Sequence, residues 1–595
     1  NFFASSRFRF SESVEAYATL TASKNETNYK IQPVPISNLF TYGPDSDIPM
    51  TVTLPVNSPF YPTALAAAAG VAGQPLNIRY RAVENGLRDT TDTNSNTRVT
   101  AGIKGDAAGW DWDAGLHYSK GKTVSHINDG FPLATKILPL LNSGTVNLFG
   151  PNSPAVIAQL RATNFVGDTF VGESVNSGVQ AKATRELWTL PGGNMAIAFG
   201  GEARRETVKQ VPNAVLSTGD ISGFGGAVKD VDASRDVKAL FAELNVPVLK
   251  TLDANFAIRN DRYSDFGSTT NPKVSLRWQP AKSVLMRGSY GKGFLAPSLF
   301  QLYSPTTATV TPAGTSDPVR CPVTRDAGFD CDTQFGVTTG GNANLKPEKS
   351  KQATLGIVIE PSASWSFAAD YFRIHLNDAI TTGLPVATIL GDLAQYGNLV
   401  TRAPSTAPFP NLPGRILRID GRNINIGAFK VEGIDLETHW KIGKFDFGKF
   451  DFDASGTYYV KNDVQNTDGS FSGFVSNQFG SPISGVLPRW KHYATLSWEK
   501  GPWSSTIGTQ FQSGYVDVNA DSDDNLRRVS SMTLWDLQVA YRGIRGLTLT
   551  LGAKNIFDTN PPLTNQQTTF QVGFDPSYYD ARARFVYLNA TYTFR

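Results

Sequence analysis

The sequence predicts an all-β fold, a large antiparallel transmembrane β-barrel with long extracellular loops. Three observations support this prediction. Apolar and polar residues alternate along many segments of about ten residues, the connections between them are alternately short and long, and aromatic residues gather near the segment ends. We count about 17 to 21 candidate strands with no helical domain between them. An open sheet rarely exceeds about 10 strands, so a closed barrel is favoured.

Composition leaves two classes of protein open. Only 18% of residues are charged, below the roughly 25% of an ordinary soluble domain. No stretch approaches the roughly 18 consecutive apolar residues of a transmembrane helix. A large soluble all-β protein and a membrane barrel both fit, since in each the polar and apolar faces of the strands together give a moderate mean hydropathy. The net charge of +3, with near-equal acids and bases, does not indicate nucleic-acid binding.

The last segment of the chain shows the alternation most clearly. Val586, Leu588, Ala590 and Tyr592 alternate with polar residues almost to the C-terminus. Chain ends usually fray, so this pattern predicts a strand that pairs with the first strand and closes the barrel.

The connection lengths favour a membrane barrel over a soluble sandwich. The turns before Leu252 and Val284 have only a few residues, whereas more than fifty residues separate Leu295 from Lys349 and more than thirty separate Ile380 from Arg415. Short turns at one end and long loops at the other are typical of outer-membrane barrels. Within the loops, residues 63–73 and 380–397 are expected to be partly helical.

Two cysteines, Cys321 and Cys331, lie in the loop-like segment RCPVTRDAGFDCD. Two Cys this close, with no others, predict a local disulfide in an oxidising compartment. The alternative is two free thiols. Zinc would require two more ligands, and no His lies nearby.

Four stretches carry a resemblance to a known family. They are a strand–loop–strand–turn–strand block at 257–303 that ends in GFLAPS, the element NLKPE at 344–348, the element GID at 433–435, and LGAKNIFDTNPP at 551–562. These stretches resemble TonB-dependent outer-membrane receptors. Residues 55–62, PVNSPFYP, resemble a loop of the Oar-like branch of that family.

The resemblance implies a barrel of about 22 strands in the outer membrane of a Gram-negative bacterium. It implies capture of a scarce ligand (siderophore, cobalamin, saccharide or peptide) at extracellular loops, and import to the periplasm with TonB-derived energy. The implied partners are the TonB complex, the barrel assembly machinery, and outer-membrane lipid and lipopolysaccharide. No cofactor is implied.

The sequence departs from the family at its start. The family begins with a plug domain and a short TonB-contacting motif, whereas NFFASSRFRF and VEAYATLTAS already have strand patterns. We therefore expect residues 1–595 to be barrel throughout, with the plug and the TonB motif not present in them. The partnership with TonB would then run through a missing N-terminal region.

Few residues are candidates for a site. Tyr592 and Phe594 resemble the aromatic end that the assembly machinery recognises, although Arg595 follows. No catalytic constellation and no metal site is evident, so an enzyme is not expected, and the ligand-binding residues are not assigned. The main alternative is a binding or adhesin-type barrel without active transport. An outer-membrane enzyme and a soluble all-β protein are weaker alternatives.

Overall fold

The computed structural model describes most of the chain. The described residues are 1–595 without 39, 44–47, 225, 312–313, 327, 406–408, 467–468, 482–484, 522, 524, 567–571 and 595.

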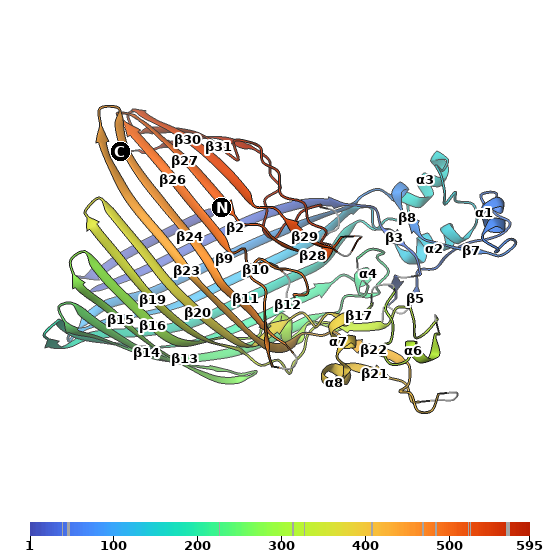
Figure 1. Ribbon diagram of the computed structural model, residues 1–595, viewed down its shortest axis with the longest axis horizontal. Helices are drawn as coiled ribbons and strands as arrows, with labels where there is room; N and C mark the ends of the chain where they lie inside the picture. The colour runs from blue at the N-terminus through green and yellow to red at the C-terminus, as the bar shows by residue number, and fades with distance from the viewer. Residues whose placement is uncertain are drawn as a thin grey trace.

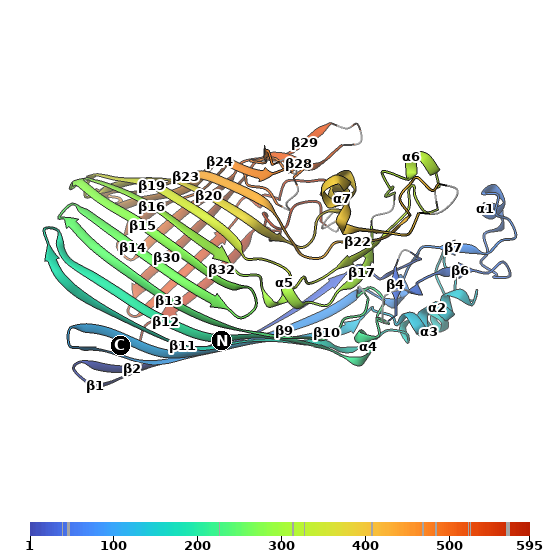
Figure 2. The ribbon, with the colours of Figure 1, turned by 90° about the horizontal axis from the view of Figure 1, so that it is seen from below.

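One large sheet of 20 strands dominates the described residues. Its strands pair antiparallel, each with the next one along the chain, and β25 and β26 follow one another along the same edge of β24. The sheet curls around an interior: in Figure 2, β30 and β32 lie behind β13–β16. The strands are β1 (Phe2–Ser11), β2 (Val14–Ile31), β9 (Arg88–Ala107), β10 (Trp110–Asp129), β11 (Gly167–Leu190), β12 (Gly193–Pro212), β13 (Val231–Leu249), β14 (Leu252–Tyr263), β15 (Gly267–Ala281), β16 (Val284–Leu295), β19 (Glu348–Ser362), β20 (Trp365–Thr381), β23 (Ile424–Phe445), β24 (Gly448–Gln465), β25 (Phe471–Gly473), β26 (Trp490–Lys500), β27 (Trp503–Gln512), β30 (Met532–Ile544), β31 (Leu547–Lys554) and β32 (Phe585–Tyr592).

At one end of the sheet, which we call the turn end, the strands are joined by two-residue turns. Nine such turns join consecutive strands, from 12–13 between β1 and β2 to 545–546 between β30 and β31. Two-residue turns match the twist of antiparallel strands when their residues have positive φ. The turn at 108–109 has this geometry, with φ of 52° at Ala108 and 76° at Gly109.

The opposite end, the loop end, carries the long connections (Figure 1). The exception is the three-residue connection 264–266 between β14 and β15. The loop elements are β3 (Pro35–Ile36), β4 (Thr41–Tyr42), β5 (Ile48–Pro49), β6 (Val52–Leu54), α1 (Thr63–Ala68), β7 (Leu76–Ile78), β8 (Tyr80–Arg81), η1 (Val83–Asn85), α2 (Ala134–Asn142), α3 (Pro154–Arg161), α4 (Ala214–Ser217), α5 (Leu299–Tyr303), β17 (Thr307–Val310), α6 (Cys321–Thr324), β18 (Gly336–Thr339), α7 (Val386–Gly391), α8 (Leu393–Tyr396), η2 (Gly397–Leu399), β21 (Val400–Arg402), β22 (Ile416–Asp420), β28 (Tyr515–Ala520) and β29 (Leu526–Val529).

The two faces of the wall differ in chemistry. On β13, Leu240 and Leu244 lie on the same face as Leu551 does on β31, and Leu240 is 72% exposed. The other face of β13 carries Arg235 and Glu243, which interact with polar side chains of neighbouring strands. An apolar outer face and a polar inner face are what a membrane barrel requires.

The seam of the barrel differs from the sequence-based expectation. Among the described residues, β32 pairs with β31 and β1 pairs with β2, but no hydrogen-bonded register joins β1 to β32. The prediction that the last strand pairs with the first is therefore wrong for this structure. Closure depends on strand number, tilt and shear together, and alternation within a single strand reports none of these.

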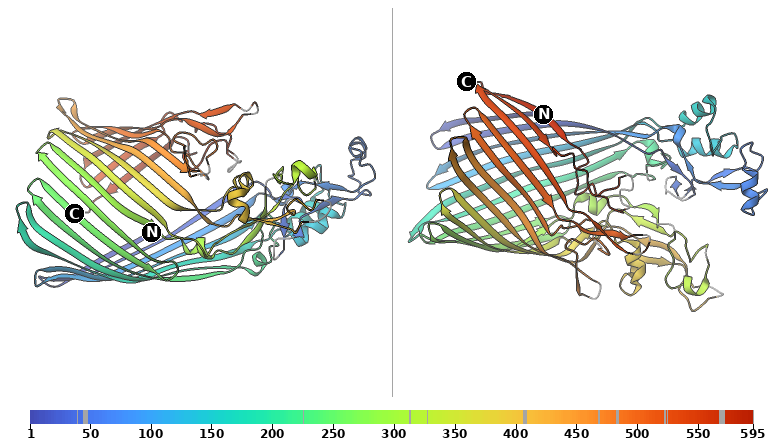
Figure 3. Two further views of the ribbon diagram at one scale, coloured as in Figure 1. Left: turned by 60° about the horizontal axis from the view of Figure 1, so that its bottom comes forward. Right: turned by 45° about the horizontal axis from the view of Figure 1, so that its top comes forward.

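The fully buried apolar side chains lie mainly in the loops. Three clusters of buried residues are centred on Ile137, Ile389 and Tyr515, all of which belong to connections at the loop end. The views in Figure 3 show the same division between a bare wall and a folded loop end. In the part of the chain that the structure describes, no helix has the length and apolar character needed to cross a membrane.

Candidate ligand-binding loops and lumen wall

Long loops at the loop end form a folded assembly of their own. The connection after β16 and the connection after β20 join in a four-stranded sheet, in the order β17, β18, β22, β21. Strands β18 and β22 pair in parallel, with Val337 opposite Ile419. Val337 and Ile419 are buried together with Ile389 of α7. These two connections, 296–347 and 382–423, therefore fold as one unit, which we call the paired loops.

The predicted disulfide lies in the paired loops and is confirmed. Cys321 and Cys331 are bonded, with their Cα atoms 5.0 Å apart. Cys321 begins the short helix α6, and Cys331 is buried at the end of the turn that follows. The bond closes a loop of about ten residues that carries several charged side chains.

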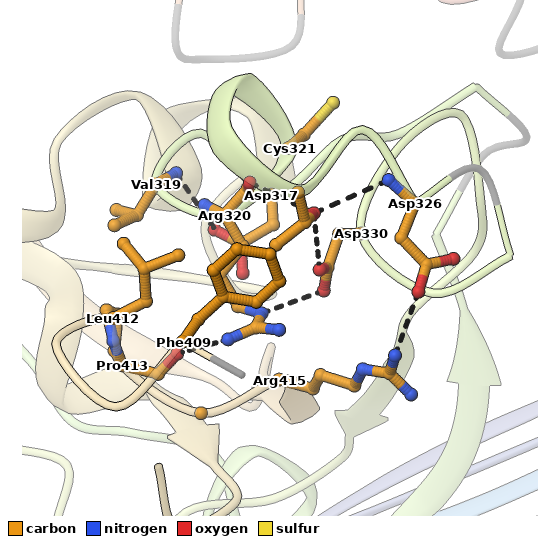
Figure 4. A network of polar contacts seen from close by, with 12 residues as sticks. Asp317, Val319, Arg320, Cys321, Asp326, Asp330, Phe409, Leu412, Pro413 and Arg415 are labelled. Atoms are coloured by element: carbon orange, nitrogen blue, oxygen red, sulfur yellow. Dashed lines mark hydrogen bonds and ion pairs between the residues drawn. The ribbon is translucent and has the colours of Figure 1, made fainter. Parts of the chain in front are cut away.

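A buried ion pair and a backbone hydrogen bond join the connection that holds the disulfide to the neighbouring connection. A second buried ion pair lies within the first connection, beside the disulfide (Figure 4). Arg402 donates two hydrogen bonds to the carboxylate of Asp317, at 2.6 Å and 3.1 Å, and Asp317 is fully buried. Arg320 donates to Asp330 at 3.0 Å and to the carbonyl of Pro413 at 2.8 Å. Bidentate and charge-assisted hydrogen bonds of this kind fix geometry strongly.

Burial and hydrogen bonding have opposite effects on the pKa of the Asp330 carboxylate. Burial opposes its ionisation, but hydrogen bonds from Arg320 and Thr324 outweigh burial and lower its pKa below the ordinary value. Asp330 therefore stays charged in spite of burial. Nearer the surface, Arg415 pairs with Asp326 at 2.8 Å, and its guanidinium lies 3.9 Å from the centre of the Phe329 ring.

The inner face of the wall carries a ladder of alternating charges on β12, β13 and β14, which we call the lumen ladder. Arg204 contacts Glu202 at 2.9 Å and Glu206 at 2.8 Å, and Arg235 contacts Glu206 at 2.7 Å. Arg235 also donates to the carbonyl of Pro297, two residues before the start of α5, at 2.7 Å. The ladder therefore connects the wall to the paired loops.

Other lumen-facing cations also have acidic partners. Arg287 donates two hydrogen bonds to the carboxylate of Asp370, at 2.7 Å and 2.6 Å, and Arg277 forms an ion pair with Asp253 at 3.3 Å. The register places Arg277 opposite Arg287 on the same face. A polar, charged lumen of this kind is able to accept a hydrated ligand or another polar segment of protein.

The predicted assembly residues lie at the turn end. Tyr592 ends β32, and its ring contacts that of Phe594 edge to face at 4.7 Å. Phe594 is 88% exposed, while Arg595 lies outside the described residues. The structure does not test whether they act as an assembly signal, which stays a prediction.

The histidines do not gather into a site. In the described part of the chain, no group of three His, Cys, Asp or Glu residues is placed to hold a metal ion. Four of the five contact a neighbouring polar group: His117 with Asn176, His126 with Asp168, His439 with Asp453, and His492 with the indole N–H of Trp490.

Sequence reasoning missed the ion pairs that organise both regions. Asp317 and Arg402 are separated by 85 residues, and no local pattern marks either as buried. The lumen ladder had a partial signal, since Glu202, Arg204 and Glu206 alternate along one strand. Alternating opposite charges on a strand place them on one face, which is where the structure has them.

The family follows from a comparison with known sequences. The sequence profile described as "TonB dependent receptor-like, beta-barrel" matches residues 36–556. The chain belongs to this family. Its members are outer-membrane proteins of Gram-negative bacteria, so the predicted family, fold class and location are confirmed. The resemblance to the Oar-like branch stays a prediction.

Curated relatives include two receptors from Pseudomonas aeruginosa. The chain is 21% identical over 409 residues to the ferric enterobactin receptor PirA, which covers 67% of the chain and 47% of the relative. It is 25% identical over 310 residues to a ferric enterobactin receptor, which covers 48% of the chain and 34% of the relative. The chain thus matches less than half the length of these relatives.

Solved structures support the fold. The chain aligns over 100% of its length with 70% of the siderophore receptor PirA from Acinetobacter baumannii, with a TM-score of 0.60 and 14% identity. It aligns over 99% of its length with 69% of a mutant of the Pseudomonas aeruginosa ferric enterobactin receptor PfeA in complex with enterobactin, with a TM-score of 0.60 and 15% identity. At such identities the likeness concerns the fold.

Proposed function

We propose that this protein is the barrel of an outer-membrane receptor that captures a scarce ligand at its loop end and imports it to the periplasm with TonB-derived energy. The observation that carries the proposal is the placement of folded, cross-linked loops over a charged lumen in a chain of the TonB-dependent receptor family. Loops on a rigid scaffold are where binding residues concentrate.

A ferric siderophore is the ligand class that we favour. Its support is the function for which the relatives are named, since they are ferric enterobactin and siderophore receptors. The paired loops would form part of the binding surface, and their disulfide and buried ion pairs would hold that surface in one shape. Pre-ordering of this kind reduces the entropy lost when a ligand binds.

Residues 1–595 would form the barrel, which binds the ligand and gives it a path through the membrane. The plug and the TonB-contacting segment that act with such barrels in the family would lie outside these residues. We propose a transport function and no enzymatic one. The assembly machinery and the TonB complex are proposed partners on the same grounds.

Iron uptake by living cells tests this function. The full coding sequence is expressed in a host that lacks its own enterobactin receptors, and uptake of ⁵⁵Fe-enterobactin is compared with and without functional TonB. Uptake that requires both the protein and TonB supports the proposal. Surface binding without uptake in TonB-positive cells contradicts it and favours an adhesin-type barrel. A panel of other ferric siderophores and cobalamin distinguishes a wrong ligand from a wrong function.

A further inference from the structure

An apolar groove lies on the outer face of the wall, across β2, β9, β10, β11, β12, β13 and β14. Its volume is about 1130 Å³, somewhat above the roughly 300–1,000 Å³ of pockets that hold drug-sized ligands. Small residues form its floor. They are Ala16, Ala101, Ala114, Ala181, Gly201 and Ala203.

Larger apolar side chains border the groove and face the membrane. Leu116 lies opposite Val179 in the register of β10 and β11, and Leu240 lies opposite Gly201 in that of β12 and β13. All three of Leu116, Val179 and Leu240 are more than half exposed. In the outer membrane this face contacts hydrocarbon, so the groove is open to acyl chains.

Two cations lie where the groove meets the loop end. Lys238 of β13 and Arg262 of β14 are opposite each other in the register and line the groove. On β13 the outward residues change from apolar at Leu240 to charged at Lys238, which marks the boundary of the lipid-facing band. Because long loops are extracellular in such barrels, this boundary lies at the outer leaflet.

These two cations differ from their neighbours in having no acidic partner. On the same face, Arg205 lies 3.5 Å from Asp236 and Lys209 lies 3.8 Å from Asp232. No hydrogen bond or ion pair to another residue engages the side chains of Lys238 and Arg262 in the described part of the chain. Their charge is therefore available to an external anion.

A second cavity continues the groove toward the loop end. Its volume is about 580 Å³, and it shares Ala203, Lys238 and Arg262 with the groove. The Arg205–Asp236 ion pair and the hydroxyl-bearing residues Ser177 and Ser264 also line it, so the two unpaired cations give this cavity its positive charge. The two cavities together form an amphipathic site, with a broad apolar part below and a cationic, hydroxyl-lined part above.

We propose that this site binds an outer-leaflet lipid that carries phosphate on a headgroup with several acyl chains, as lipid A does. The acyl chains would fill the groove, and a phosphate would lie between the Lys238 ammonium and the Arg262 guanidinium. Basic pockets at the membrane boundary bind anionic lipid headgroups, and guanidinium groups match phosphate geometry. The inference depends on the outer-membrane location and not on which ligand the receptor imports.

Charge removal tests the cationic part of the site. The full coding sequence is expressed in a Gram-negative outer membrane, the protein is purified in detergent, and binding of added diphosphoryl lipid A is measured by native mass spectrometry. The variant K238Q/R262Q should bind lipid A about tenfold more weakly or worse. The control K209Q, on the same face but with its own acidic partner, should bind as the wild type does. Equal binding by all three proteins overturns the proposal.

Groove filling tests the apolar part and keeps both cations. The variant A181L/A203L should also lose lipid A binding, whereas heat-modifiable migration on a detergent gel should show an unchanged barrel. Unchanged lipid A binding by this folded variant overturns the proposal. Dephosphorylated lipid A tests the role of the phosphate. If it binds as tightly as the diphosphoryl form, the site does not recognise phosphate.

Discussion

The turn end and the loop end of the barrel are stabilised in opposite ways. At the turn end, nine two-residue turns join neighbouring strands, and each depends on the conformations of two adjacent residues. At the loop end, segments far apart in the sequence hold one another through a shared sheet and a buried ion pair. Local interactions therefore close the hairpins, and long-range interactions shape the surface that faces the exterior.

The two ends of the barrel also differ in how much sequence change they tolerate. Two-residue turns leave little room for variation, because their geometry restricts both residues. Long loops tolerate changes in length and sequence, and they are where recognition residues concentrate. In this protein the paired loops combine that freedom with a core of their own, and the lumen ladder joins them to the wall at Pro297.

The largest effect is expected at the turn end, from the C-terminal aromatic residues. Deletion of residues 592–595 should abolish assembly into the outer membrane, since it removes the end of β32 and the exposed pair Tyr592 and Phe594. Membrane fractionation and heat-modifiable migration measure this. Removal of Arg595 alone is the control and should leave assembly intact. Normal insertion of the longer deletion would refute the assigned signal.

The next effect is expected from the buried ion pair of the paired loops. Substitution Arg402→Ala leaves the fully buried carboxylate of Asp317 without its partner, and such a loss typically costs about 3–5 kcal/mol. Hydrogen exchange in residues 296–347 should accelerate accordingly, while exchange in the wall stays unchanged.

Arg415→Ala is the matched control, because its pair with Asp326 is partly exposed. Exposed ion pairs contribute about 0–1 kcal/mol, so a small effect is expected. If both variants increase hydrogen exchange in the paired loops equally, the Arg402–Asp317 ion pair does not have the larger stabilising role assigned to it.

A smaller effect is expected from the disulfide. The double variant Cys321→Ser/Cys331→Ser removes a bond that closes a loop of 10 residues in sequence separation. On the chain-entropy model this costs about 3 kcal/mol, confined to the paired loops. Protease cleavage within 321–331 should become faster, whereas barrel migration should not change. Unaltered cleavage would show that the buried ion pairs are sufficient to hold the loop.

The smallest effect is expected at a single turn. Ala108 adopts a φ of 52°, a conformation that Asn tolerates better than Ala. Ala108→Asn should therefore raise the free energy of unfolding by up to about 1 kcal/mol, measured by urea unfolding in lipid vesicles. Gly109→Ala, at a φ of 76°, should lower it. A change in loop hydrogen exchange in either variant would contradict the independence of the two ends.

Much of the wall could be predicted from the sequence. Alternation identified strands near their observed bounds: the strand expected to begin at Leu252 does so, and the loop expected between Leu295 and Lys349 runs from the end of β16 to the start of β19. The helical segments expected at 63–73 and 380–397 are observed as α1, α7 and α8. These features depend on residues close together in the chain, which is why a local pattern reveals them.

The sequence by itself determined the two-faced strands, the placement of short and long connections, the family and the proximity of Cys321 to Cys331. Only the tertiary structure decided that Asp317 meets Arg402, that two loops share one sheet, and that β1 and β32 are not paired. It also showed that Lys238 and Arg262 adjoin an apolar groove. The physical reason is that alternation is set by the backbone of one strand, whereas contacts between distant segments depend on how the whole sheet curves.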